Sequence, residues 1–317
     1  MRRRVQLISI AVGLLACVAL AAQSGLTPTE TGKTWRTSWG DPDLQGSWSN
    51  ATTTPLQRPA KFGTREFLTP EERVEADKPK RDVNRGERGA TAEADLDGSY
   101  NQFWREDALS DGRTSLVYDP PDGQIPMTPA GEKRRAAFAR TSGVDSWEDR
   151  SLFDRCILRN SVPRLPSQYN NNYEIVQSPG YVAILQEQIH DTRLIPLDGR
   201  PHLDPSVRQW FGDARGRWEG NTLVVETTNF SDRTDFEGAG PNMQVIERWT
   251  RLADERIDYR FTVEDATAWT RPWSGALAWN KVGPLFEYAC HEGNYSLYNI
   301  LEGARIGEGE ARANPAK

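Results

Sequence analysis

The chain contains only three histidines, and each lies among ionisable or amide side chains rather than within an apolar run. His190 and His202 bracket a segment that also contains Asp191. His291 follows a cysteine and precedes Glu292. Histidine titrates near neutral pH and binds metals as a neutral imidazole. These two stretches are therefore the best candidates for a chemical centre.

Three interpretations of these residues remain open. In the first, His190, His202 and His291 hold a divalent transition metal whose fourth position stays open for water or substrate. In the second, Asp191 or Glu292 orients His190 or His291 for proton transfer without a cofactor. In the third, the imidazoles only bind loop backbones at the rim of the fold. The spacing does not decide between them, because the helical His-Glu-x-x-His motif is absent.

Amide and guanidinium side chains close to the histidines are candidates for substrate binding. Asn171 and Asn172, followed by Tyr173, could recognise hydroxyl or amide groups, because an amide both donates and accepts hydrogen bonds. Arg193 and Arg200 could bind an acid or stabilise an oxyanion. The alternative for the asparagines is a turn that enters a strand, since Asn tolerates left-handed backbone.

Several classes of function are excluded by missing patterns. The sequence has no Gly-x-Ser-x-Gly elbow, no Gly-x-Gly-x-x-Gly turn and no phosphate-binding loop, so we expect no nucleotide cofactor. The formal net charge of −6 argues against a nucleic-acid partner, whose phosphates are bound mainly by Lys and Arg. A small molecule is the expected partner.

Residues 1–22 have the pattern of a secretory signal peptide. Arg2–Arg4 precede an apolar stretch over 5–16, and Ala19–Ala21 is a small-x-small cleavage site. The stretch is too short for a comfortable membrane span, and no second one follows. We therefore expect a periplasmic or secreted protein. Because the residues before Cys17 resemble a lipobox, a lipid anchor at that cysteine is the alternative.

Two cysteines, Cys156 and Cys290, remain after cleavage. An even pair in an exported chain indicates a disulfide, and two thiols in a metal site are the alternative. The long loop that such a bond would close corresponds to about 5 kcal/mol in the chain-entropy description, as an upper figure.

The pattern from Tyr173 onward is that of strands joined by tight turns such as Gly220-Asn221. No helix there is long enough for a parallel crossover, so the fold class predicted is mainly β, with a calycin-like antiparallel up-and-down barrel. Alternation around Glu247 is imperfect, which indicates a partly polar interior. The tryptophans of this region are expected in the core: Trp210, Trp218, Trp249, Trp269, Trp273 and Trp279. The strands are expected at 173–177, 181–185, 192–197, 217–219, 222–230, 244–252, 256–263, 267–279 and 285–290.

Outside the barrel the sequence predicts little regular structure. Two short helices are expected to begin after the N-caps Thr69 and Thr128. The charged, glycine-rich stretch 78–98 is expected to be an exposed loop or disordered. The segments predicted after the signal peptide are a flexible leader (23–43), an irregular N-terminal region with the two short helices (44–169), the barrel (170–305) and a disordered tail (306–317).

Gly46-Ser-Trp48 resembles the Gly-x-Trp signature of the calycins, in which the Trp closes the floor of a lipocalin barrel. Longer blocks resemble a family of exported bacterial proteins without an assigned activity. This resemblance covers nearly all of the mature chain and implies export, but it brings no reaction with it. The blocks are Asp43–Trp48, Asp119–Gly123, Asn170–Tyr173, Ile189–Asp191, Ile195–His202, Gly216–Gly220 and Tyr288–Tyr295.

Together these patterns predict an exported enzyme, a lyase or hydrolase, that acts on a small polar or aromatic natural product. The alternative is a lipocalin-like binding protein with no catalytic activity.

Overall fold

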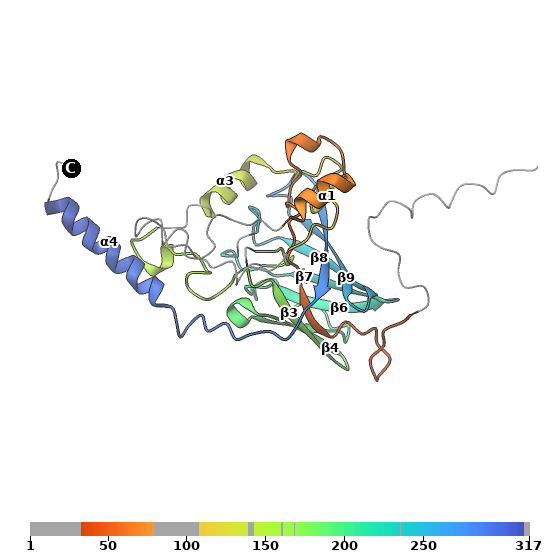
Figure 1. Ribbon diagram of the computed structural model, residues 1–317. Coiled ribbons are helices and arrows are strands. Elements are labelled where there is room, and N and C mark those ends of the chain that lie inside the picture. The colour runs from red at the N-terminus through yellow and green to blue at the C-terminus, as the bar shows by residue number, and fades with distance from the viewer. Residues whose placement is uncertain are drawn as a thin grey trace, which may run out of the picture.

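The structure, a computed structural model, describes residues 33–78, 108–138, 143–159, 161–167, 169–234 and 236–313. Its fold is mainly β, a nearly closed antiparallel barrel of nine strands, which confirms the predicted calycin-like barrel (Figure 1). A short strand, β2 (Val117–Asp119), pairs with β10 off the main path. The nine barrel strands are β1 (Gly46–Ser49), β3 (Asn172–Ser178), β4 (Tyr181–Gln186), β5 (Thr192–Pro196), β6 (Asp213–Glu219), β7 (Thr222–Thr228), β8 (Gln244–Ala253), β9 (Arg256–Glu264) and β10 (Trp273–Lys281).

The strand order is β5-β4-β3-β1-β10-β9-β8-β7-β6. Because nine strands alternate in direction, β5 and β6 at the two ends run the same way and cannot continue the antiparallel ladder. Side chains close this seam. A Cβ on Gly216 of β6 would lie 2.8 Å from Ile195 of β5 and 2.6 Å from Leu197. The absence of a side chain at Gly216 therefore lets the edge strands approach.

Alternating side chains fill the barrel. Along β8, Val245, Glu247 and Trp249 are buried, whereas Ile246 and Arg248 are exposed. The buried carboxylate confirms the predicted polar component of the interior. Aromatic rings make up much of the rest, and four of the predicted core tryptophans are at most 1% exposed, while Trp210 and Trp218 are only partly buried. The four are Trp249, Trp269, Trp273 and Trp279.

β1 lies between β3 and β10, so the barrel does not begin at residue 170 as predicted. Trp48 of β1 is fully buried, and its indole Nε1 donates to the carbonyl of Leu44 at 2.9 Å. A four-residue strand whose partners follow more than 120 positions later has no local hairpin signal, which explains why the sequence pattern missed its place.

The two predicted N-terminal helices are present as α1 (Pro70–Ala76) and α3 (Pro129–Phe138). Thr69 caps α1 in a capping box with Glu72, and the Thr128 hydroxyl accepts from the Gly131 amide at 3.0 Å. The structure also contains short 3-10 turns: η1 (Ala60–Phe62), η3 (Trp147–Asp149) and η4 (Gln188–His190).

Two C-terminal predictions are wrong. Residues 285–290 form no strand, and residues 306–313 of the predicted disordered tail belong to helix α4 (Tyr295–Ala313), which projects away from the barrel (Figure 1). The helix forms although it contains three glycines, each of which weakens it. Asn294 caps the first turn, because its Oδ1 accepts from the amide of Leu297 at 3.3 Å.

Several predictions fall where the structure gives no description. The signal peptide with Cys17, most of the leader and most of the stretch 78–98 lie outside the described residues. Among the helices that are described, none combines the length and the apolar character needed to cross a bilayer.

Candidate functional site

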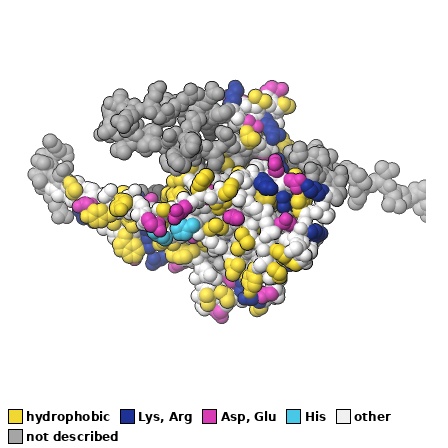
Figure 2. Space-filling model, turned by 60° about the horizontal axis from the view of Figure 1, so that its bottom comes forward, with side chains coloured by type: hydrophobic (Ala, Val, Ile, Leu, Met, Phe, Trp, Pro, Cys, Tyr) yellow, Lys and Arg dark blue, Asp and Glu magenta, His cyan; other side chains and the backbone are white. Residues whose placement is uncertain are grey.

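Two of the three histidines meet at one end of the barrel. His190 ends η4, in the connection from β4 to β5, and His291 lies in the segment that leads into α4. Their ring centroids are 5.9 Å apart, with the rings edge to face at 76°. Both residues are exposed, and Figure 2 shows histidine side chains at the surface beside acidic and hydrophobic ones. The pair is therefore open to a small molecule from solvent.

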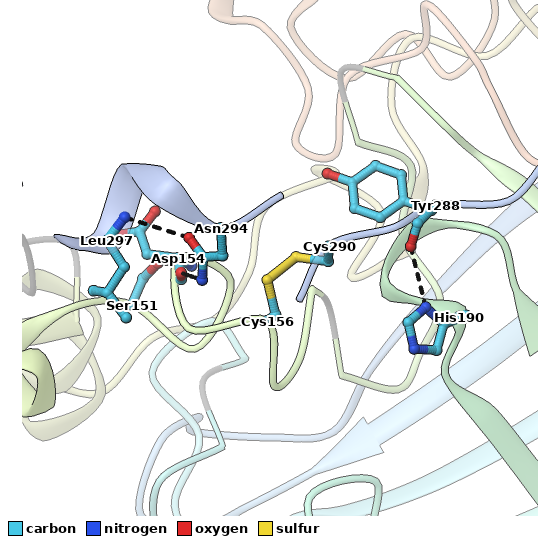
Figure 3. Close-up of a disulfide and its surroundings, with 8 residues drawn as sticks. All are labelled: Ser151, Asp154, Cys156, His190, Tyr288, Cys290, Asn294 and Leu297. Carbon is cyan, nitrogen blue, oxygen red and sulfur yellow. Dashed lines mark hydrogen bonds between the residues drawn. A yellow bond between two sulfur atoms is a disulfide. The ribbon is translucent and has the colours of Figure 1, made fainter. Parts of the chain in front are cut away.

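A backbone carbonyl selects the tautomer of the neutral His190 ring. Its Nδ1 lies 3.1 Å from the carbonyl oxygen of Tyr288 (Figure 3). A carbonyl only accepts hydrogen bonds, so this contact requires the proton on Nδ1 and leaves the lone pair on Nε2 in the neutral ring. An imidazole held in this tautomer is ready to accept a proton at Nε2.

Asp191 adds a carboxyl that titrates near neutral pH. Burial raises its pKa from 3.8 to about 6, more than the nearby positive charges of Arg164, His190 and His291 lower it. Its Oδ2 is buried and has no hydrogen-bond partner among the described residues. Such perturbed carboxyls are concentrated at functional sites.

The backbone around these residues is strained. Ile189 has φ 67° and His190 has φ 51°, and a β-branched residue rarely adopts this left-handed region. The described part of the chain has six non-glycine residues with positive φ. Four of them belong to this end of the barrel: Ile189, His190, Cys156 and Asn170. Strain of this kind persists only where surrounding contacts impose it, and it clusters at functional sites.

Glu187 supplies many of those contacts. Its buried carboxylate accepts hydrogen bonds from the side-chain amides of Asn170 and Asn172 and, at 3.4 Å, from the backbone amide of Phe286. One side chain thus joins the asparagine run, the β4–β5 connection and the C-terminal segment. No sequence pattern indicates this role, because a lone Glu in a loop is normally a solvated charge.

The predicted disulfide is confirmed between Cys156 and Cys290, with a Cα–Cα distance of 5.8 Å (Figure 3). It fixes the residue next to His291 to the loop that precedes β3. The Asn294 amide adds a second tie by donating to the carbonyl of Asp154 at 2.8 Å. The position of His291 therefore depends on this cross-link.

The predicted substrate-binding asparagines have structural partners instead. The amide of Asn172 binds Glu187, and buried Asn171 accepts from the Ser167 backbone at 2.6 Å. The turn interpretation fits better, because Asn170 takes left-handed backbone. Tyr173 is also a core residue, packed on Trp279 with centroids 4.4 Å apart.

The two predicted arginines do not join the histidine pair. Arg193 points into the barrel, where it lies 2.6 Å from Glu247 and bonds Thr227. Arg200 is exposed, pairs with Asp198 and reaches the hydroxyl of Tyr181 at 3.0 Å. Tyr181 begins β4 and His190 follows its end, so about 17 Å of strand separates Arg200 from the site.

The predicted three-histidine metal site is not formed. His202 is held elsewhere, with Nδ1 2.9 Å from the carboxylate of Asp213. Among the described residues, which include all three histidines, no three His, Cys, Asp or Glu side chains are grouped so as to hold a metal ion. Glu292 is exposed and has no hydrogen bond or ion pair with the described residues, whereas the positive charges of both rings act on the carboxyl of Asp191 and lower its pKa.

A hollow of about 400 Å³ adjoins the site at the disulfide. It is lined by Tyr288 and Cys290, which flank the histidine pair, and by Phe153, Tyr169 and Asn294 among others. Neither histidine is in its wall. Its aromatic and amide side chains could hold the body of a small molecule next to the two imidazoles.

Comparison of the sequence with protein-family models and with curated proteins finds no match. The resemblance to exported bacterial proteins therefore stays a prediction.

Proposed function

We propose that this protein is an exported acid–base enzyme, a lyase or hydrolase for a small polar or aromatic compound. The observation that carries the proposal is the contact between His190 Nδ1 and the Tyr288 carbonyl, which leaves Nε2 as a base beside a second imidazole. General acid–base catalysis needs such a pair, one group to take a proton and one to return it.

In this proposal His190 Nε2 takes a proton from the substrate or from an attacking water, and His291 protonates the leaving group. Asp191 acts through His190: above about pH 6 its carboxylate stabilises the imidazolium that forms. The disulfide supports an oxidising compartment and hence export.

The alternative, a lipocalin-like protein that binds a ligand within the barrel, is less well supported. The interior positions are taken by large buried rings, among them Trp48, Trp249 and Trp279, which are all fully buried.

The test is a turnover screen with small esters and with compounds that can undergo β-elimination, followed by mass spectrometry. Asn tolerates the left-handed backbone of His190, so His190→Asn changes only the side chain. We expect His190→Asn and His291→Asn each to lower kcat/KM roughly 100-fold or more. The matched control is His202→Asn, which removes the histidine bound to Asp213 and should leave turnover intact. Turnover that survives His190→Asn would refute the proposal.

A further inference from the structure

A second hollow, of about 520 Å³, is bordered by the loop that carries Cys156. Residues between 150 and 159 together with Ser161 form most of its wall, and Glu148, the end of α3 and residues 232–233 complete it. Phe153 lines both this hollow and the one beside the disulfide, so the two are neighbours but are formed by largely different residues.

The wall of this second hollow is unusually basic for a chain of net charge −6. It contains four arginines and two acids, Glu148 and Asp232. Arg150 is paired with Asp154 at 2.8 Å. The other three arginines (Arg155, Arg159 and Arg233) form no ion pair with any described residue. An anion is the ligand that would neutralise them.

Two of these arginines are held by aromatic rings rather than by carboxylates. The guanidinium of Arg159 lies 4.2 Å from the ring centroid of Phe153, and that of Arg155 lies 4.6 Å from that of Trp147. A contact with a ring holds a guanidinium without using its N–H donors, which stay available for a planar anion.

Polar atoms in the same wall are buried without partners. Ser161 is 1% exposed, and its hydroxyl has no hydrogen bond with any described residue. The Nε atom of Arg159 is likewise buried and unpartnered within the described chain. Buried polar atoms are nearly always hydrogen-bonded in folded proteins, so a donor set of this kind indicates a ligand.

Apolar side chains complete the wall: Phe138, Leu152, Phe153 and Leu158. An inorganic anion would leave these apolar side chains without a contact. An aromatic carboxylate would contact both the arginines and the apolar side chains. We infer that this hollow binds a small aromatic carboxylate, with the carboxylate on Arg159 and its neighbours and the ring against the apolar wall. The inference does not depend on the proposed acid–base activity.

Calorimetric titration of the full mature protein with benzoate tests the inference. We expect saturable binding that Arg233→Gln and Arg159→Gln each weaken roughly tenfold or more, the size of a charge-assisted hydrogen bond. Arg233 is exposed and unpaired, so its replacement should leave folding intact even if Arg159→Gln does not. The matched control is Arg217→Gln, which removes an exposed arginine paired with Glu219 and should not change binding.

Three further titrations complete the test. Benzyl alcohol, which lacks the charge, and inorganic phosphate, which lacks the ring, should both bind far more weakly than benzoate. His190→Asn should bind benzoate normally, which separates this hollow from the proposed active site. The inference is overturned if benzoate does not bind, if it binds Arg233→Gln and Arg159→Gln as well as the unaltered protein, or if phosphate binds equally well.

Discussion

Asp191 shows how one residue can carry opposing electrostatic effects. Burial raises the pKa of its carboxyl, and the cations around it lower that pKa by less. Arg164, a fully buried neighbour, has its own pKa lowered by burial. The two charges attract each other but do not offset the loss of hydration. The net result is a carboxyl that is ionised only at a cost to stability.

This cost predicts a stabilising substitution. The folded pKa of about 6 lies above the ordinary 3.8, so ionisation lowers stability progressively as pH rises from about 4 to about 6. The shift corresponds to about 3 kcal/mol, and we reduce this to about 1–2 kcal/mol because solvent screens a half-exposed group. Asp191→Asn should therefore be more stable than the unaltered protein by about that amount above pH 7, and the gain should vanish below pH 4.

Urea unfolding at a series of pH values measures this difference. A gain of equal size at pH 3.5 and pH 7.5 would show that the carboxyl is not the cause.

At the scale of elements, the connection from β4 to β5 depends on its neighbours. Its left-handed residues are held by contacts with the segment that Cys290 anchors, among them the bond from His190 to Tyr288. The disulfide joins residues 134 positions apart, so it restricts the conformations of the unfolded chain considerably.

Replacing both cysteines by serine, as Cys156→Ser with Cys290→Ser, should lower the free energy of unfolding by about 3–5 kcal/mol. We also expect the amide protons of residues 286–292 to exchange faster with deuterium while those of β7–β9 stay protected. Equal protection of residues 286–292 in both proteins would contradict the proposed anchoring.

The sequence predicted the elements whose signals are local. Alternation and tight turns located β3 to β9, and capping residues located α1 and α3. Pairings between distant residues were not accessible in the same way. The insertion of β1 between β3 and β10, the carboxylate of Glu187 as a hub and the separation of His202 from the other histidines all depend on tertiary contacts. Chemistry-bearing residue types could be recognised, but not which of them meet.

At the scale of the whole molecule, closing the barrel is the main structural problem. The parallel edges β5 and β6 lack a ladder, and a buried ion pair inside the barrel joins β5 to β8, two strands in from β6. Arg193 and Glu247 are 3% and 0% exposed, and the hydroxyl of Tyr259 donates to Glu247 at 2.9 Å. The pair links strands that the sheet leaves unconnected.

Removing one member of the Arg193–Glu247 pair should lower the stability far more than replacing both residues. Glu247→Gln leaves a buried guanidinium without its counter-charge and should cost about 3–5 kcal/mol of stability. The double replacement Arg193→Met with Glu247→Leu keeps the volume and should recover most of that loss. Thermal and urea unfolding of the unaltered protein, Glu247→Gln and the double variant measure these differences in stability. A double variant no more stable than Glu247→Gln would argue that the ionic pair itself closes the barrel.

The central claim is that the fold holds His190 with its proton on Nδ1, so that Nε2 is the base. Long-range ¹H–¹⁵N NMR of the imidazoles at pH 8 tests it most directly, because protonated and unprotonated ring nitrogens have widely separated shifts. We expect the neutral His190 ring to carry its proton on Nδ1 and to have Nε2 bare. A neutral His190 ring with its proton on Nε2 would contradict the account, since that ring could neither donate to Tyr288 nor accept a proton at the exposed nitrogen.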